Sequence, residues 1–259
     1  LSLTIGPYAF CGRNVKLLGL QPFSDLTIEE FAFAKCTFSK TGNKKGYGIQ
    51  IDNDVDSNNR PIPIVIGQHA FYTADFGTET FNLVIGESKA TTGSVIGYHA
   101  FESSKGLIKL TFVEENGGPI GIEDYAFYRS GVTNSDPEDE SQFLRFPTRV
   151  SKIGEKSFAE CQSIAGAVYI KDKSIGAYAF YNCTNIKKII IHNCETIEKG
   201  AFEICFNSNF GIENLTITCD RDINSQVDSI TTEIQERAFY GSGLQCKLVL
   251  HSFISSIGE

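Results

Sequence analysis

A six-residue pattern of apolar positions, Ile-x-x-x-Ala-Phe, recurs along the whole chain, with Ser in place of Ala in one copy. Where they are closest, successive isoleucines of this pattern lie 22 or 23 residues apart. The longest interval is 38 residues, so some repeats carry inserts. The nine complete copies begin at Ile5, Ile28, Ile66, Ile96, Ile122, Ile153, Ile175, Ile197 and Ile234, and a tenth begins at Ile257.

A second apolar pattern, L-x-x-L-x-L, stands upstream of the isoleucine in several repeats, with complete examples that start at Val15, Leu107, Ile186 and Ile212. The alternation at its end is the period of a strand with one buried face. The Ala-Phe pair then falls on a short helical or turn segment, where Ala lets the backbone approach its neighbour and Phe fills the interior. We expect one buried column of rings from Phe10, Phe33, Phe71, Phe101, Phe127, Phe158, Phe180, Phe202 and Phe239.

A repeat of this length cannot bury its apolar face alone, whereas stacked repeats share a continuous core. Because the period lies in the leucine-rich-repeat range, we expect an α/β repeat solenoid. It should have a parallel β-sheet on one face, and short helical turns and loop inserts on the others. Residues 1–259 are expected to form a single domain of about ten repeats. The chain starts at Leu1 without Met and stops inside a repeat, so we expect a piece of a longer chain, since solenoids need capping units.

The run I-G-x-x-A-F-x-x-C, followed by L-x-x-I-x-I and a V-x-x-I return, resembles the BspA-like leucine-rich-repeat family. The closest stretch is 144–161, and the resemblance covers essentially the whole chain. The resemblance implies a surface or secreted protein of a bacterium or a parasitic protist that adheres to host extracellular or cell-surface proteins or to other cells. The alternative is an intracellular leucine-rich-repeat scaffold or receptor-like interaction protein.

Charge and motifs narrow the function further. The chain has 23 Lys and Arg against 31 Asp and Glu, a net charge of −8, which argues against nucleic acid as a partner. No apolar run approaches the roughly 18 to 20 residues that cross a bilayer, so we expect no membrane insertion within this segment. G-x-S-x-G, H-E-x-x-H and P-loop motifs are absent from the sequence. We therefore expect a non-enzymatic protein without a cofactor.

Cysteine and histidine positions follow the repeat. Five of the eight cysteines occupy repeat positions that face the interior, and we expect them to be buried free thiols: Cys36, Cys161, Cys183, Cys194 and Cys205. Cys11, Cys219 and Cys246 lie elsewhere, which leaves one oxidised pair open. His69 and His99 share a repeat position that also accepts Tyr, Lys, Gly and Arg, so a solvent-facing position is favoured over a two-histidine metal site.

One acidic insert, 52–58, has carboxylates at alternate residues, like the start of a calcium loop. It departs from the EF-hand pattern, because Ser57 stands where Gly is needed and Pro63 where the bidentate Glu belongs. We favour a solvated insert, and we expect no metal site.

The outward positions of the predicted strands suggest a binding face. One row is partly basic, and its neighbour is β-branched: Val84, Thr111, Val168, Ile190, Thr216 and Val249. β-branched residues suit strands in any case, but exposed apolar rows also mark contact sites. We hypothesise that a protein partner binds this sheet face, or else the inserts after Cys36, Phe127 and Phe202. The candidate residues of the face are Lys109, Arg145, Lys187, Lys188, Ile190 and Lys247.

Overall fold

The architecture is taken from a computed structural model, and it places most of the repeat positions identified above. The structure describes residues 2–16, 19–20, 25–39, 48–51, 64–85, 93–112, 118–133, 144–206, 211–219, 231–244 and 253–259. The calcium-like insert 52–58 and Lys247 lie outside these residues. Within the part of the chain that the structure describes, no helix is long and apolar enough to cross a membrane.

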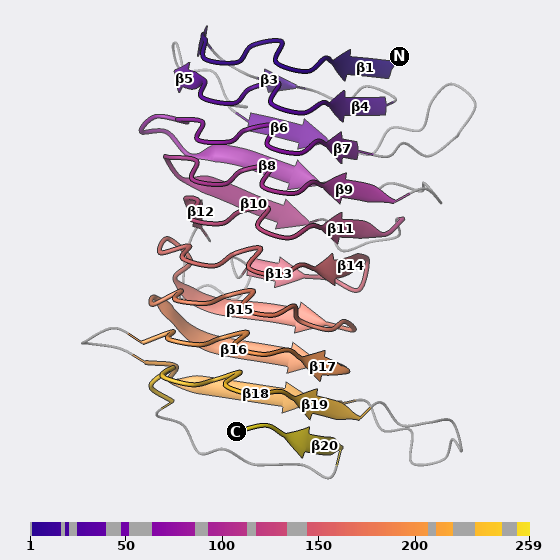
Figure 1. The fold of residues 1–259 in the computed structure, drawn as a ribbon, viewed down its shortest axis with the longest axis vertical. Coiled ribbons are helices and arrows are strands. Elements are labelled where there is room, and N and C mark those ends of the chain that lie inside the picture. The colour runs from indigo at the N-terminus through magenta and orange to yellow at the C-terminus, as the bar shows by residue number, and fades with distance from the viewer. Residues whose placement is uncertain are drawn as a thin grey trace.

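One parallel sheet contains the repeat isoleucines and is called the isoleucine sheet here (Figure 1). The sheet has two hydrogen-bonded parts, and single-residue bridges at Ile175 connect β14 (Val150–Ile153) of the first part with β17 (Thr196–Ile197) of the second. All ten repeat isoleucines are therefore aligned side by side, which confirms the repeat register read from the sequence. Its strands are β1 (Ser2–Ile5), β4 (Asp25–Ile28), β7 (Ile64–Ile66), β9 (Ser94–Ile96), β11 (Ile120–Ile122), β14 (Val150–Ile153), β17 (Thr196–Ile197), β19 (Thr232–Ile234) and β20 (Ile254–Ile257).

The L-x-L segments form a second set of parallel strands, called the leucine sheet here. It consists of two hydrogen-bonded parts, and β10 (Ile108–Phe112) of the first part contacts β13 (Leu144–Phe146) of the second. The first part comprises β3 (Gly19–Leu20), β6 (Gly48–Ile51), β8 (Phe81–Ile85), β10 (Ile108–Phe112) and β12 (Val132–Thr133). The second part comprises β13 (Leu144–Phe146), β15 (Gly166–Lys171), β16 (Ile186–His192) and β18 (Asn214–Thr218).

The expectation of one parallel sheet is therefore wrong. The chain returns through an extended segment before each isoleucine, and this segment pairs with its neighbours as the L-x-L segment does. A short third pair, β2 (Asn14–Lys16) with β5 (Thr37–Ser39), lies near the N-terminus. Both main sheets run along the long axis of the molecule (Figure 1), and their inward side chains face the same core.

The predicted short helical segments are also wrong, because the described residues contain no helix. The first repeat shows the alternative, three consecutive turns in which Ala9, Cys11 and Arg13 donate their N–H groups to the carbonyls three residues earlier. Tyr8 has φ of 56° and Gly12 has φ of 69°. A left-handed residue interrupts a right-handed helix, so the Ala-Phe pair is held in turns.

The predicted phenylalanine column, called the inner column here, is confirmed. Neighbouring rings are nearly parallel, with centroids 4.8 to 5.5 Å apart. The rings are fully buried except near the two ends, where Phe10 is 43 % exposed and Phe239 is partly buried. Hydrogen bonds reinforce the stack between repeats: Phe71, for example, donates its N–H to the carbonyl of Ala100 at 2.7 Å.

The five cysteines at repeat positions are buried free thiols, as expected. Three of them, Cys161, Cys183 and Cys205, lie beneath the turns of consecutive repeats. Each thiol donates to the carbonyl of the phenylalanine in the preceding repeat; for Cys183 and Phe158 the Sγ–O distance is 3.1 Å. Burial raises the pKa of Cys161 and of Cys205 to about 12. These thiols serve as small packing groups that satisfy backbone carbonyls, because thiols with such pKa values stay protonated near neutral pH.

Candidate interaction surface

The outward side chains of the leucine sheet fall into rows, because strand partners are in register. Arg145 of β13 lies opposite Tyr169 of β15, which lies opposite Ile190 of β16. Thr216 of β18 continues this row. On β10, Lys109 pairs with Asn82. The surface therefore combines positive, aromatic and aliphatic groups on one regular backbone.

The structure places the predicted site residues as follows. Arg145 and Ile190 share one row, whereas Lys188 lies in a neighbouring row between Ala167 and Asn214. Lys187 is the extra residue of a bulge, because the register shifts between the pairs that precede and follow it. Lys109 lies on β10, in the part of the sheet next to β13. The partner-binding role of all these residues stays a prediction.

Tyr169 belongs to this surface, and the sequence analysis missed it. The guanidinium carbon of Arg145 lies 5.0 Å from the centroid of the Tyr169 ring, a cation–π contact. Val168 was predicted instead to lie in the outward row, and this prediction is wrong, since Val168 is completely buried. Aligning Val168-x-Ile170 with Leu144-x-Phe146 would have found the register, because β15 pairs with β13 in that way.

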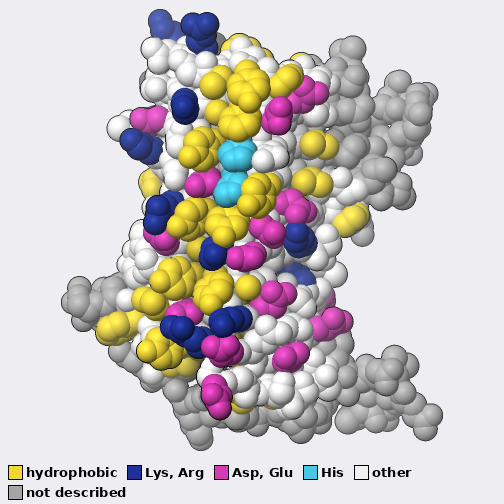
Figure 2. Space-filling model, in the orientation of Figure 1, with side chains coloured by type: hydrophobic (Ala, Val, Ile, Leu, Met, Phe, Trp, Pro, Cys, Tyr) yellow, Lys and Arg dark blue, Asp and Glu magenta, His cyan; other side chains and the backbone are white. Residues whose placement is uncertain are grey.

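A second column of side chains lies two residues before the inner phenylalanines and is called the outer column here. It was predicted to face solvent, but most of its members are half-buried, and their rings stack along the axis. Two adjacent histidines lie within a band of hydrophobic side chains along the long axis (Figure 2). The column consists of Tyr8, Phe31, His69, His99, Tyr125, Lys156, Tyr178, Gly200 and Arg237.

The geometry of the two histidines disfavours a shared metal ion. The His69 and His99 rings stack with their centroids 4.9 Å apart and their planes 12° apart. Lone pairs in the planes of stacked rings run parallel instead of converging on one point. Nδ1 of His99 instead contacts the Glu102 carboxylate. The described residues contain no group of three or more His, Cys, Asp or Glu side chains that would hold a metal ion.

Several basic groups outside the leucine sheet are bound in ion pairs. Arg129 donates two hydrogen bonds to Glu160, at 2.9 and 3.1 Å, and these bonds hold the pKa of the Glu160 carboxyl below its usual value. Lys199 lies 3.0 Å from Glu236. Exposed pairs of this kind contribute little stability, but they neutralise charge locally on the side of the molecule where they lie.

Comparison with known proteins agrees with the repeat pattern. A family model described as "BspA type Leucine rich repeat region" matches six copies, over residues 64–205 and 138–259. No curated protein and no solved structure matches the chain. The matched region contains the inner column from Phe71 onward and most of both sheets.

Proposed function

The chain belongs to the BspA-type leucine-rich-repeat family, and from this premise we propose that it is a non-enzymatic protein-binding module for adhesion. Membership of this family supports the interpretation of the chain as a repeat module for protein interaction. We propose further that residues 1–259 act as one solenoid at the cell surface or after secretion, where they bind a host extracellular or cell-surface protein.

The outward face of the leucine sheet is the proposed binding surface. The observation that carries this proposal is the row Arg145, Tyr169 and Ile190, flanked by Lys187 and Lys188. Tyrosine and arginine are enriched among the residues that dominate binding energy at protein interfaces. Strands fixed by neighbours on both sides lose little conformational entropy on binding. The basic groups would attract an acidic partner despite the net negative charge of the chain.

Charge reversal tests this proposal. The whole chain, coated on fluorescent beads, is applied to intact host cells, and adhering beads are counted. The variant K109E/K187E/K188E is expected to lose most adhesion. The matched control R13E/K35E/K105E changes the net charge equally at exposed basic residues outside the leucine sheet and is expected to adhere like the unmodified chain.

The inserts are the competing site. A third variant lacks residues 52–60 and 134–142, which leaves β6 of the leucine sheet in place, and the proposal expects it to keep adhesion. If the charge reversals leave adhesion intact and the deletions abolish it, the proposed surface is wrong and the inserts bind the partner.

A further inference from the structure

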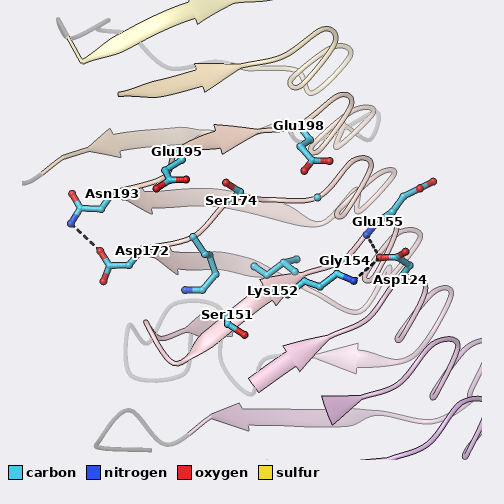
Figure 3. Close-up of a pocket in the computed structure, with 13 residues that line it drawn as sticks. Asp124, Ser151, Lys152, Gly154, Glu155, Asp172, Ser174, Asn193, Glu195 and Glu198 are labelled. Atoms are coloured by element: carbon cyan, nitrogen blue, oxygen red, sulfur yellow. Dashed lines mark hydrogen bonds and ion pairs between the residues drawn. The ribbon is translucent and has the colours of Figure 1, made fainter. Parts of the chain in front are cut away.

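A polar cavity of about 470 Å³ opens on the outward side of the isoleucine sheet. Figure 3 shows Ser151, Ser174 and Glu195 between two flanks, with Asp172 and Asn193 on one side and Asp124, Lys152 and Glu155 on the other. The lining residues come from four consecutive repeats. The volume falls within the roughly 300–1,000 Å³ of ligand-binding pockets.

The backbones of consecutive repeats approach each other closely beside the cavity. Gly154 and Gly176 follow the repeat isoleucine, as glycine does in most repeats, whereas Glu29, Glu123 and Glu198 hold this position in others. A Cβ atom on Gly176 would lie 2.5 Å from the carbonyl oxygen of Ile153. Ser151 and Ser174, which have small side chains, line the cavity between the flanks.

The two lysines of the cavity are already engaged. Lys152 Nζ lies 2.5 Å from Glu123 and 3.5 Å from Asp124. Lys173 is buried and donates to the backbone carbonyls of Phe146, Pro147 and Lys171. Burial lowers the pKa of Lys173 to about 8. Neither ammonium group is therefore available to a carboxylate of a ligand.

Two of the five carboxylates that line the cavity, those of Glu195 and Glu198, are available to a cation. The other three each lie within 4.0 Å of a lysine ammonium group: Asp124, Glu155 and Asp172. Asp124 accepts the N–H of Glu155 at 3.0 Å, and Glu198 accepts the N–H of Ala177 at 3.0 Å. Glu195 is exposed, and among the described residues no basic group forms an ion pair with Glu195 or Glu198. The backbone thus fixes Glu198, while Glu195 from the same repeat projects into the cavity region (Figure 3).

We propose that this cavity binds a basic side chain of a protein partner. A divalent ion fits less well, because the carboxylates surround a cavity and no group of three acidic, His or Cys side chains within the described part of the chain would hold a metal. Arginine fits best, since its planar guanidinium presents five donors and can reach carboxylates and serine hydroxyls on neighbouring repeats. The inference rests on the proposed function in one respect, that the ligand belongs to a protein.

The test uses the whole ¹⁵N-labelled chain and N-acetyl-arginine methylamide as the probe. Saturable amide shifts are expected at Ser151, Ser174 and Gly176. In E195Q/E198Q the dissociation constant should rise at least about fivefold, the loss expected for two partly exposed charge contacts. The control E213Q/E233Q removes two exposed carboxylates outside the cavity and should bind like the unmodified chain.

A second variant, S174K, places an ammonium group in the cavity without changing a buried residue, and it should abolish the shifts. Absent shifts, equal weakening in both double variants, or saturation by Ca²⁺ but not by the arginine probe would each overturn the proposal. Because the probe does not depend on the leucine sheet, K109E/K187E/K188E should bind it normally. Failure of the cavity is thereby distinguished from failure of the proposed adhesion surface.

Discussion

The inner and outer columns belong to the same turns, two residues apart, yet residue identity varies far more in the outer column. The inner column is phenylalanine in all nine repeats, whereas the outer column contains six residue types. Both columns stack along the axis, and every outer residue has φ between 49° and 62°. Burial inside the core therefore restricts residue identity strongly, whereas a left-handed backbone at a half-buried position restricts it weakly.

Truncation in the two columns should show the largest difference. Phe127→Ala removes a fully buried ring that contacts Phe101 and Phe158, and it should cost about 3–5 kcal/mol of unfolding free energy. Tyr125→Ala, in the same turn, loses stacking on His99 and should cost about 1 kcal/mol. Urea denaturation monitored by circular dichroism measures both. Equal losses would contradict the distinction between the columns.

The reactivity of the buried cysteine thiols tests how firmly the core beneath the turns stays closed. A rise in thiol pKa from 9 to about 12, as for Cys161 and Cys205, leaves about a thousandfold fewer thiolates near neutral pH. Iodoacetamide at pH 8, followed by peptide mass mapping, should leave both cysteines unmodified in the native chain. The same treatment in urea should modify them. Rapid native labelling would show that the core beneath the turns opens readily.

Relief of left-handed backbone strain should change the unfolding free energy by a smaller amount and in the opposite direction, so that the chain becomes more stable. Ile204 has φ of 57°, unusual for a β-branched residue, and Gly241 holds the equivalent position in the next repeat with φ of 62°. Ile204→Gly should stabilise the chain by about 0.5–1 kcal/mol, since strain is relieved at a partly exposed position. Gly241→Ala should destabilise it by about 1 kcal/mol. Thermal melting tests both, and a loss in the first variant would show that side-chain packing outweighs the strain.

The smallest expected effect is the pH dependence of the outer column. Burial, and then the neighbouring His99, lower the pKa of His69. The unfolded chain therefore binds a proton at this residue more readily, so its contribution to stability is complete above about pH 6.5 and declines as pH falls below that value. His69→Phe, which keeps a stacking ring like that of Phe31, should flatten the decline of urea midpoints between pH 7 and 5. His192→Gln is the control and should leave the decline unchanged.

The core was predictable because its pattern is strict. The alignment of the repeat isoleucines, the phenylalanine column and the five buried cysteines all follow from the spacing of the repeats, because each repeat must place the same groups inside. The isoleucine sheet was missed because its strands, such as Ile64–Ile66, are too short to show alternation. The left-handed turns were missed because Tyr, His and Lys at these positions carry no signal, unlike the Gly200 that occurs once. The cavity was not predicted because its lining combines side chains from four consecutive repeats, and the arrangement of these side chains is seen only in the structure.

Lysine footprinting on the bound chain tests the central claim, that the outward face of the leucine sheet contacts the partner. The chain is allowed to adhere to intact host cells, acetylated briefly and analysed by peptide mass spectrometry beside the unbound chain. Adhesion should protect Lys109, Lys187 and Lys188, while Lys35 and Lys105 are modified equally in both states. Unchanged modification of the three sheet lysines, with protection elsewhere on the molecule, would contradict the claim.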